Sequence, residues 1–339
     1  MRIGFDTSVL ARPCPRGVAR VARGLVAALE RRGRLEIVRL TPAPCERVSL
    51  WRQFALPRRA TELELRGIHS PVSAFPIFGR GARVATIHEI PWARGVSENS
   101  DARHKLWARV GPLRADAILT PSATTAALVR DESALAAQRV HIAPWGVDAS
   151  FSPAVTPSDE GILARHGLSN RDFVLASGAT RPKKHPAAGM AALQRTRTDM
   201  LLVATGAITE HILRELARFP SIASRVRLLG EVDDATLSVL NRHAQAVLVL
   251  SDSEGFGLPV VEAQASGTPV ITARGTAQSE IAGAAGLQVD PTDAAEVAHA
   301  IDESMTRRVQ LAADGYANAA RFTWDACAER VEHVWRSLA

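Results

Sequence analysis

Two glutamates flank a glycine turn in the stretch SDSEGFGLPVVEAQASGTPVI, which covers residues 251–271. The apolar run before it predicts a buried strand, and Pro259 is favoured in the first turn of a helix, so a strand-to-helix turn lies between them. This places Glu254 in the turn and Glu262 in the first turn of the helix. Carboxylates held in place in this way accept hydrogen bonds from sugar hydroxyls.

The backbone of the same turn suits an anionic group. Gly255 and Gly257 permit positive φ angles and close approach to a ligand, so the amides of Gly255, Phe256, Gly257 and Leu258 can converge on one group. The N-terminus of the following helix adds roughly half a positive charge. Together these features predict a ligand that carries both hydroxyls and phosphates, such as a nucleotide sugar.

Each of these features also has a purely structural explanation. A glutamate in the first turn of a helix contributes roughly 0.3–1 kcal/mol through the helix dipole without any ligand, and Gly-Phe-Gly also fits an ordinary turn. The segment is not a dinucleotide-binding fingerprint, because Val260 stands where the third glycine would be. Two carboxylates also form glycosidase pairs, but a helix start beside an expected phosphate is a poor place for the second acid.

Two further side chains are candidates for chemistry. Lys184 follows the apolar run FVLAS and a glycine turn, which places a cation where a phosphate is expected; a solvated lysine in a basic loop is the alternative. His88 ends the run VATIH, at the carboxyl end of a predicted strand, where parallel sheets bind ligands. A single histidine at such a position is also often structural.

The elements that position these residues are visible as short apolar runs that alternate with helical patterns. The chain opens with a strand at 2–5, and after Gly17 a helical face contains Val18, Val21, Ala22, Leu25, Val26 and Leu29. Apolar runs then recur at 68–71, 84–92, 117–125, 140–148, 173–180, 200–206, 226–232, 246–253 and 269–274. This alternation is typical of βαβ units in parallel sheets.

A change of composition separates two doubly wound α/β domains. Residues 148–160, DASFSPAVTPSDE, contain prolines and little periodicity, which predicts a domain junction. We therefore expect one domain at 1–150 and a second at 151–321. A final amphipathic helix is expected at 322–339, with Cys327, Val331, Val334 and Leu338 on one stripe.

The composition is that of a soluble globular protein, with 46% hydrophobic and 22% charged residues. No apolar run approaches the ~20 residues that cross a bilayer, and Asp6 interrupts the N-terminal apolar run, so we expect no signal peptide. Three scattered cysteines predict neither disulfide bonds nor a metal cluster. A cytoplasmic protein is expected.

Charge is distributed unevenly along the chain. Residues 1–150 contain 23 Lys and Arg against 13 Asp and Glu, whereas the rest contains 18 against 22. A basic domain attracts nucleic acid, an anionic membrane or an anionic substrate, although general use of arginine over lysine explains it equally well. Mixtures of Trp, Leu and Arg at 50–59 and 103–114 suit an anionic membrane surface or a lipid diphosphate acceptor, and a solvated basic face explains them equally well. With 5% aromatic residues and no nucleic-acid motif, a nucleic-acid partner is not expected.

The pattern E-G-F-G-L-P-x-x-E, followed by A-x-x-x-G-x-P-V, resembles the E-x7-E signature of retaining glycosyltransferases of family 4, which have the GT-B fold of two facing Rossmann-like domains. The similarity extends over 226–274 and through SEIAGAAGLQVDPTD. ASGATRPKKHPAAGMAAL resembles the family's phosphate-binding turn. FTWDACAERVEHVW resembles the family's closing helix, which crosses back to the first domain. Weaker similarity is present at MRIGFDTSVL, RGVARVARGLVAAL, TIHEIPW and PWGVD.

The resemblance implies roles for the matching residues. Glu254 and His88 would contact the transferred sugar as catalytic residues, Glu262 would bind the ribose hydroxyls, and Lys184 would neutralise the leaving diphosphate. The remaining donor contacts would come from the amides of 255–258, from Gly230 and Val232 beside the nucleobase, and from Gly17 and Arg16 of a loop in the first domain.

This chain departs from the family pattern at one cation. Many members have an arginine five residues before the matching lysine, where this chain has Ala179. Arg181 or Lys183 would have to replace it, because a lysine also meets a phosphate as a point charge. Related members also place aspartate after the histidine, where this chain has Glu89.

The implied reaction is retaining transfer of a hexosyl group from a nucleotide-diphosphate sugar to a polysaccharide, glycolipid or lipid-linked acceptor. Guanosine-linked mannose is favoured because GATRPKKH and SDSEGFGLP most resemble mannosyltransferase members; uridine-linked sugars stay open. The sequence has no Asp-x-Asp element, so we expect no metal cofactor, with a lysine and backbone dipoles stabilising the leaving group instead. The other hypotheses are a different nucleotide-sugar enzyme, such as an epimerase, and a non-catalytic binding protein.

Overall fold

The computed structural model describes residues 1–12, 14–96, 102–196 and 199–338, which form two compact units. The first unit contains residues 1–146 together with 322–339, and the second contains residues 147–321. Two six-stranded parallel sheets, one in each unit, confirm the predicted α/β fold class. The boundary lies at 146/147, so the junction expected at 150/151 falls inside a loop of the second unit.

The sheet of the first unit has the strand order β2-β1-β3-β4-β5-β6. Its strands are β1 (Arg2–Asp6), β2 (Glu36–Leu40), β3 (Gly67–Ser70), β4 (Ala82–Thr86), β5 (Ala117–Thr120) and β6 (Val140–Ile142). The α-helices are α1 (Ser8–Ala11), α2 (Arg16–Arg32), α3 (Val48–Leu50), α4 (Leu56–Glu62), α5 (Ala102–Arg114), α6 (Ala123–Glu132) and α15 (Trp324–Ser337). Short helical turns are η1 (Trp51–Ala55), η2 (Pro91–Arg94) and η3 (Ala134–Arg139).

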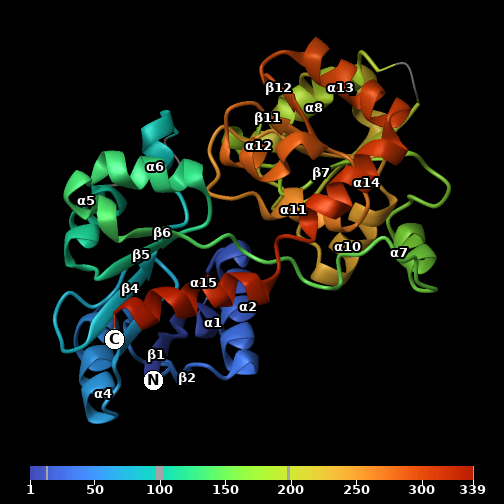
Figure 1. Ribbon diagram of the computed structural model, residues 1–339. Coiled ribbons are helices and arrows are strands. Elements are labelled where there is room, and N and C mark those ends of the chain that lie inside the picture. The colour runs from blue at the N-terminus through green and yellow to red at the C-terminus, as the bar shows by residue number, and fades with distance from the viewer. Residues whose placement is uncertain (13, 97–101, 197–198, 339) are drawn as a thin grey trace. The chain divides into compact units, whose positions relative to one another are not determined.

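Helix α15 returns from the second unit to pack on α2 of the first (Figure 1). Gly24 of α2 faces Trp324, because a Cβ at this position would lie 2.3 Å from the indole. Arg32 forms a two-point contact with the fully buried Glu332, at 2.9 and 3.2 Å. The predicted apolar stripe of α15 therefore contains one charged residue, which is tolerated because its partner comes from α2.

The sheet of the second unit has the strand order β12-β11-β10-β7-β8-β9. Its strands are β7 (Phe173–Ala176), β8 (Leu201–Ala204), β9 (Val226–Leu228), β10 (Ala246–Val249), β11 (Val270–Ala273) and β12 (Gly286–Val289). The α-helices are α7 (Asp159–Arg165), α8 (Pro186–Leu193), α9 (Glu210–Ala217), α10 (Asp234–His243), α11 (Leu258–Ala265), α12 (Ala277–Ala282), α13 (Ala294–Thr306) and α14 (Arg308–Ala319), with turns η4 (Pro182–Lys184), η5 (Pro220–Arg225) and η6 (Gly283–Ala285).

Burial follows the position of each strand in the sheet. Every residue of β7, β8, β10 and β11 is buried, as expected for strands covered by helices on both faces. The four edge strands β2, β6, β9 and β12 are each largely half-exposed or exposed. All the inner strands were predicted from the sequence, as were β6 and β9, but β2 and β12 were not.

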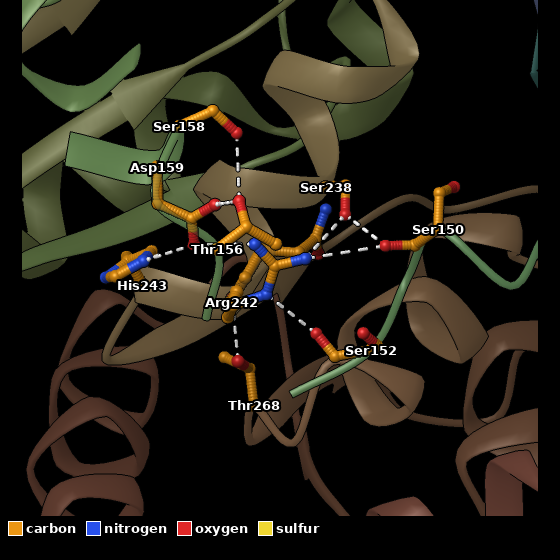
Figure 2. A network of polar contacts seen from close by, with 10 residues as sticks. Ser150, Ser152, Thr156, Ser158, Asp159, Ser238, Arg242, His243 and Thr268 are labelled. Atoms are coloured by element: carbon orange, nitrogen blue, oxygen red, sulfur yellow. Dashed lines mark hydrogen bonds and ion pairs between the residues drawn. The ribbon is translucent and has the colours of Figure 1, made fainter. Parts of the chain in front are cut away.

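A polar network ties the segment before α7 to the second unit (Figure 2). Arg242, near the end of α10, pairs with Asp159 at 2.6 Å and donates to the carbonyl of Ser152 at 2.8 Å. Asp159 also accepts hydrogen bonds from Thr156 and His243. The Arg242 and Asp159 side chains are only 7% and 2% exposed. The segment predicted as a linker is therefore attached to the flank of α10.

Within residues 1–12, 14–96, 102–196 and 199–338, no helix is both long enough and apolar enough to cross a membrane.

Candidate functional site

The candidate residues of the second unit gather where the strand order reverses. Strand β7 is the first strand of this unit, and its neighbours are β8 on one side and β10 on the other. Connections that leave to opposite sides open a crevice at the carboxyl ends of these strands, which is where doubly wound sheets bind ligands. Lys183 and Lys184 follow β7, and Glu254 follows β10.

The two lysines meet the glutamate at this point. Glu254 Oε1 lies 3.3 Å from Lys184 Nζ and 3.7 Å from Lys183 Nζ, and Ser251 Oγ donates to it at 3.4 Å. The Lys183 side chain is 3% exposed and that of Glu254 is 24% exposed. Burial by itself raises the pKa of Glu254, but the charges of Lys184, Lys183 and Arg181 outweigh it, so the pKa is lowered. Glu254 is therefore an ionised acceptor at neutral pH.

The turn after Glu254 leads directly into the N-terminus of α11. Gly257 precedes the helix with a φ of 102°, and a Cβ there would lie 3.0 Å from Gln278 Cγ, so the turn requires glycine. Phe256 is fully buried and anchors the turn in the core. Leu258 is the first residue of the helix and Pro259 lies in its first turn.

The expected position of Glu262 is wrong by one turn of helix. Because α11 begins at Leu258, Glu262 is its fifth residue, and the first turn contains no acidic side chain. Its side chain is buried, at 2% exposure of the residue. Any stabilisation of the helix dipole by Glu262 is correspondingly weaker than expected, because that effect fades beyond the first turn.

Three glycine turns line the carboxyl ends of β7, β8 and β9. Gly178, Gly206 and Gly230 have φ angles of 63°, 114° and 71°. The amide of Gly178 donates to Thr205 Oγ1 at 3.0 Å, and the amide of Gly206 donates to the carbonyl of Gly230 at 2.8 Å. These bonds hold the three turns next to one another, with Gly230 and the half-buried Val232 just beyond the carboxyl end of β9.

A histidine–aspartate pair that was not among the predicted site residues also lies at the carboxyl ends of β7 and β10. His185 follows Lys184, and its Nε2 lies 2.6 Å from Asp252 Oδ1. The amide of Asp252 also donates to the carbonyl of Lys183 at 3.0 Å. No motif pointed to this pair, because the two residues stand 67 positions apart in the chain.

The remaining candidates lie in the first unit. His88 follows β4, and its Nε2 lies 2.7 Å from the carbonyl of Pro71; its ring is 5.0 Å from that of Trp145. Burial lowers the pKa of His88, with the Pro71 hydrogen bond acting in the opposite direction. Because a carbonyl only accepts, Nε2 carries the hydrogen, and the neutral ring keeps Nδ1 as an acceptor.

Gly17 and Arg16 do not form a loop, as was expected. They are the first two residues of α2, and both are exposed. No heavy atom would lie within 4 Å of a Cβ on Gly17, so neither positive φ nor close packing requires glycine here. What they present is the N-terminus of a 17-residue helix, which is suited to an anion.

In the part of the chain that the structure describes, no three His, Cys, Asp or Glu side chains are placed to hold one metal ion.

Fold and site together define a class of protein, namely a two-unit α/β protein whose second unit gathers two lysines and a glutamate at the carboxyl ends of its parallel strands. Residues 160–322 match the family model of the glycosyl transferases group 1. HepE of Anabaena, solved in complex with UDP and glucose, superposes with a TM-score of 0.80 at 17% identity over 99% of this chain and 100% of that one. Sucrose-phosphate synthase of Thermosynechococcus elongatus superposes at 0.79 with 18% identity, over 99% and 98%.

Among curated proteins, the O-antigen chain mannosyltransferase B of Escherichia coli is 28% identical over 52% of this chain and 49% of its own length. The D-inositol 3-phosphate glycosyltransferase of Stackebrandtia nassauensis is 33% identical over 63% of this chain and 52% of its own length. The matched region thus spans about half the length of these relatives. The family match covers residues 160–322, just under half of the chain, and the chain has the GT-B fold, as the sequence motifs indicated.

Proposed function

We propose that this chain is a metal-independent, retaining glycosyltransferase. It moves a hexosyl group from a nucleotide-diphosphate sugar to a polysaccharide, glycolipid or lipid-linked acceptor in the cytoplasm. The observation that carries the proposal is the meeting of Lys183, Lys184 and Glu254 at the carboxyl ends of β7 and β10, beside the N-terminus of α11.

The cluster supplies what departure of a diphosphate requires. As the bond between the anomeric carbon and the phosphate oxygen breaks, negative charge grows on the phosphate. Lys184 and the N-terminus of α11 would stabilise that charge, with the nearly buried Lys183 beside them. Because little water reaches Lys183, its charge is weakly screened and acts more strongly on a bound phosphate.

Glu254 has the complementary task of holding the sugar. Its pKa is lowered, so it is ionised and accepts hydrogen bonds from hydroxyls of the hexose. Glu262 would bind the ribose, and Gly230 and Val232 would border the base. His88 offers Nδ1 as an acceptor for one hydroxyl and would orient the sugar. Retention of the anomeric configuration is inferred from the resemblance of 254–262 to the E-x7-E signature. In such a reaction the acceptor oxygen bonds to the anomeric carbon on the face from which the diphosphate leaves, and the proton of the acceptor hydroxyl passes to the leaving phosphate.

The donor we favour is GDP-mannose. The name of the Escherichia coli relative supports mannose as the transferred sugar. The complexes of HepE with UDP and with UDP-glucose support a uridine-linked donor as the alternative. A thermal-shift panel of GDP, UDP, dTDP and ADP separates these, because a ligand that binds only the folded state raises its melting temperature by mass action.

Two variants and a control test the assignment of roles. Lys184→Ala should abolish the nucleoside-diphosphate thermal shift, whereas Glu254→Gln should keep that shift and lower turnover by about 100-fold or more. Arg307→Ala removes a surface cation that pairs with Glu303 on α13 and should change neither readout. Release of nucleoside diphosphate that needs no acceptor would contradict transferase activity and favour a hydrolase, whereas conversion of the nucleotide sugar into an isomer without net release would favour an epimerase. Binding without any turnover would favour a non-catalytic protein.

The acceptor side of the proposal involves an anionic membrane surface. Leu106, Val110 and Leu113 of α5 are all exposed at a spacing of four and three, which puts them on one stripe. Arg109 and Arg114 lie on the same helix and are exposed as well. An apolar stripe with flanking arginines favours an anionic lipid interface.

A second exposed apolar group lies close to α5. Phe54 on η1 and Phe78 in the loop between β3 and β4 are each 69% exposed. Gln53 beside Phe54 bonds to the backbone of Phe75, and the Phe75 ring packs edge-on against Trp107 of α5 at 5.7 Å. One loop therefore connects both groups of exposed apolar side chains.

Vesicle co-sedimentation tests this surface. The chain should bind vesicles of phosphatidylglycerol and phosphatidylcholine but not phosphatidylcholine alone, and Leu106→Glu with Leu113→Glu should abolish binding. Val309→Glu, at an 86% exposed position of the second unit, is the matched control and should bind normally. Equal loss in the control would contradict the assignment.

A further inference from the structure

The loops that carry the opposing charges of the site are joined by more than those charges. One loop follows β7 and contains Lys183, Lys184 and His185, and the other follows β10 and contains Asp252 and Glu254. They are joined by the backbone bond from Asp252 to Lys183 and by the 2.6 Å contact of His185 with Asp252. The third connection is the lysine–glutamate contact at 3.3 and 3.7 Å.

The third connection cannot persist when a donor is bound as proposed. A diphosphate would take up the lysine ammonium groups, and hexose hydroxyls would take up Glu254. The His185–Asp252 contact and the backbone bond are outside this exchange, so they are what continues to hold the two loops together. Asp252 Oδ1 only accepts, so His185 Nε2 donates to it.

The backbone conformation of His185 is unfavourable for a residue with a side chain, which indicates that the side chain has a role here. His185 has a φ of 47° and a ψ of 55°, one of three non-glycine residues with positive φ in the described part of the chain. Glycine adopts this conformation at less cost than a residue with a Cβ. Strained backbone of this kind gathers at functional sites, where the surrounding structure maintains it.

Resting on the proposed function, we infer that His185 and Asp252 are a positioning pair that fixes Lys184 relative to Glu254 for the donor. Neither residue needs to touch the reacting atoms. His185 is covalently next to Lys184, and Asp252 precedes Glu254 by two positions, so the pair sets where each loop presents its charged group. A pair at 24% and 42% side-chain exposure adds little to stability. Its effect should therefore appear in donor binding rather than in melting temperature.

The sharpest variant is His185→Gly, because it removes the side chain and relieves the positive φ together. It should melt within about 2 °C of the parent chain, yet raise the donor KM about tenfold. Asp252→Ala should do the same, and the double variant should be no worse than either single one, since both remove one interaction. His185→Asn, which tolerates the same φ and keeps a donor, should recover part of the loss.

A readout independent of activity separates this inference from the proposed function. Hydrogen exchange at the Asp252 amide, which is bonded to Lys183, should be faster in His185→Gly than in the parent chain. If exchange is unchanged, or if the single variants add up in the double variant, the positioning pair is refuted. If exchange accelerates while the parent chain binds none of the four nucleoside diphosphates, the pair is upheld as a connection between loops and the proposed donor site fails.

Discussion

The contact between Asp159 and Arg242 gives the most quantitative prediction for this chain. Burial by itself raises the pKa of Asp159, but hydrogen bonds from Thr156, Arg242 and His243 outweigh it and lower the pKa from 3.8 to about 2. A carboxyl with a lowered folded-state pKa stabilises the protein above its unfolded pKa and loses that contribution as pH falls through the folded value. The stability contribution of Asp159 is therefore lost as the pH falls from about 4 to about 2.

The size of the effect follows from the shift. A difference of nearly two pKa units at ~1.4 kcal/mol each corresponds to about 2–3 kcal/mol of unfolding free energy at neutral pH. Asp159→Asn removes this contribution and leaves the guanidinium of Arg242, 7% exposed, without its anion. Removing one partner of a buried pair costs about 3–5 kcal/mol, so we expect a loss of about 3 kcal/mol at pH 7.

The assay uses an asymmetry of the chain. All six tryptophans lie in the first unit, at 51, 92, 107, 145, 324 and 335. Urea unfolding followed by tryptophan fluorescence thus reports the first unit, whereas far-UV circular dichroism reports both. Asp159→Asn should move the dichroism transition to lower urea concentration and leave the fluorescence transition nearly unchanged. The difference in unfolding free energy between the variant and the parent chain should become smaller between pH 4 and pH 3.

The control is Asp199→Asn, which changes an 86% exposed carboxylate of the same unit and should cost less than about 1 kcal/mol. The argument from the buried pair is refuted if the loss of unfolding free energy in Asp159→Asn stays constant from pH 7 to pH 3, or if it does not exceed the loss in the control.

Three further predictions concern the first unit. Gly24→Ala should destabilise it by about 1–3 kcal/mol in the fluorescence assay, because the new Cβ would meet Trp324; Gly17→Ala, with no atom within 4 Å, should not destabilise it. Glu332→Ala should cost about 3 kcal/mol by leaving Arg32 without its buried partner, whereas Asp325→Ala, at an exposed pair with Arg31, should cost less than about 1 kcal/mol. Burial raises the pKa of Cys327 to about 12, so iodoacetamide at pH 8 should label the exposed Cys45 in the native chain and reach Cys327 only after denaturation; equal labelling of both would contradict the buried position.

Most of the fold was predictable because it depends on local patterns. The inner strands appear in the sequence as continuous apolar runs, such as FVLA and AVLV, since helices cover both faces of the sheet. Two of the four edge strands, EIVRL and GLQV, were missed because their partly exposed residues include charged or polar side chains that interrupt the apolar run. Helix α11 begins at Leu258, earlier than the sequence pattern predicted. This leaves the motif unchanged but moves Glu262 out of the first turn.

The candidate site was predictable in its residue types but not in its contacts. Glu254 and Lys184 could be named from a glycine turn and a strand end, because such turns supply close backbone approach and helix N-termini. That Lys183 is nearly buried against the same carboxylate, and that His185 reaches Asp252, could not be read from spacing. Neither pair shares an element, so no periodicity relates the partners.

The sequence alone determined the inner strands and the glycine turns that follow them, and it placed acidic and basic groups at the ends of particular strands. This was possible because side-chain periodicity and turn chemistry act over a few residues. The tertiary structure decided which strand ends are neighbours. Strand β10 lies beside β7 rather than β9 because the chain crosses over between them, and only this crossover brings Glu254 to Lys183 and Lys184. The same long-range packing joins Asp159 to Arg242 across 83 positions, a pairing fixed by how α7 and α10 meet and not by either segment by itself.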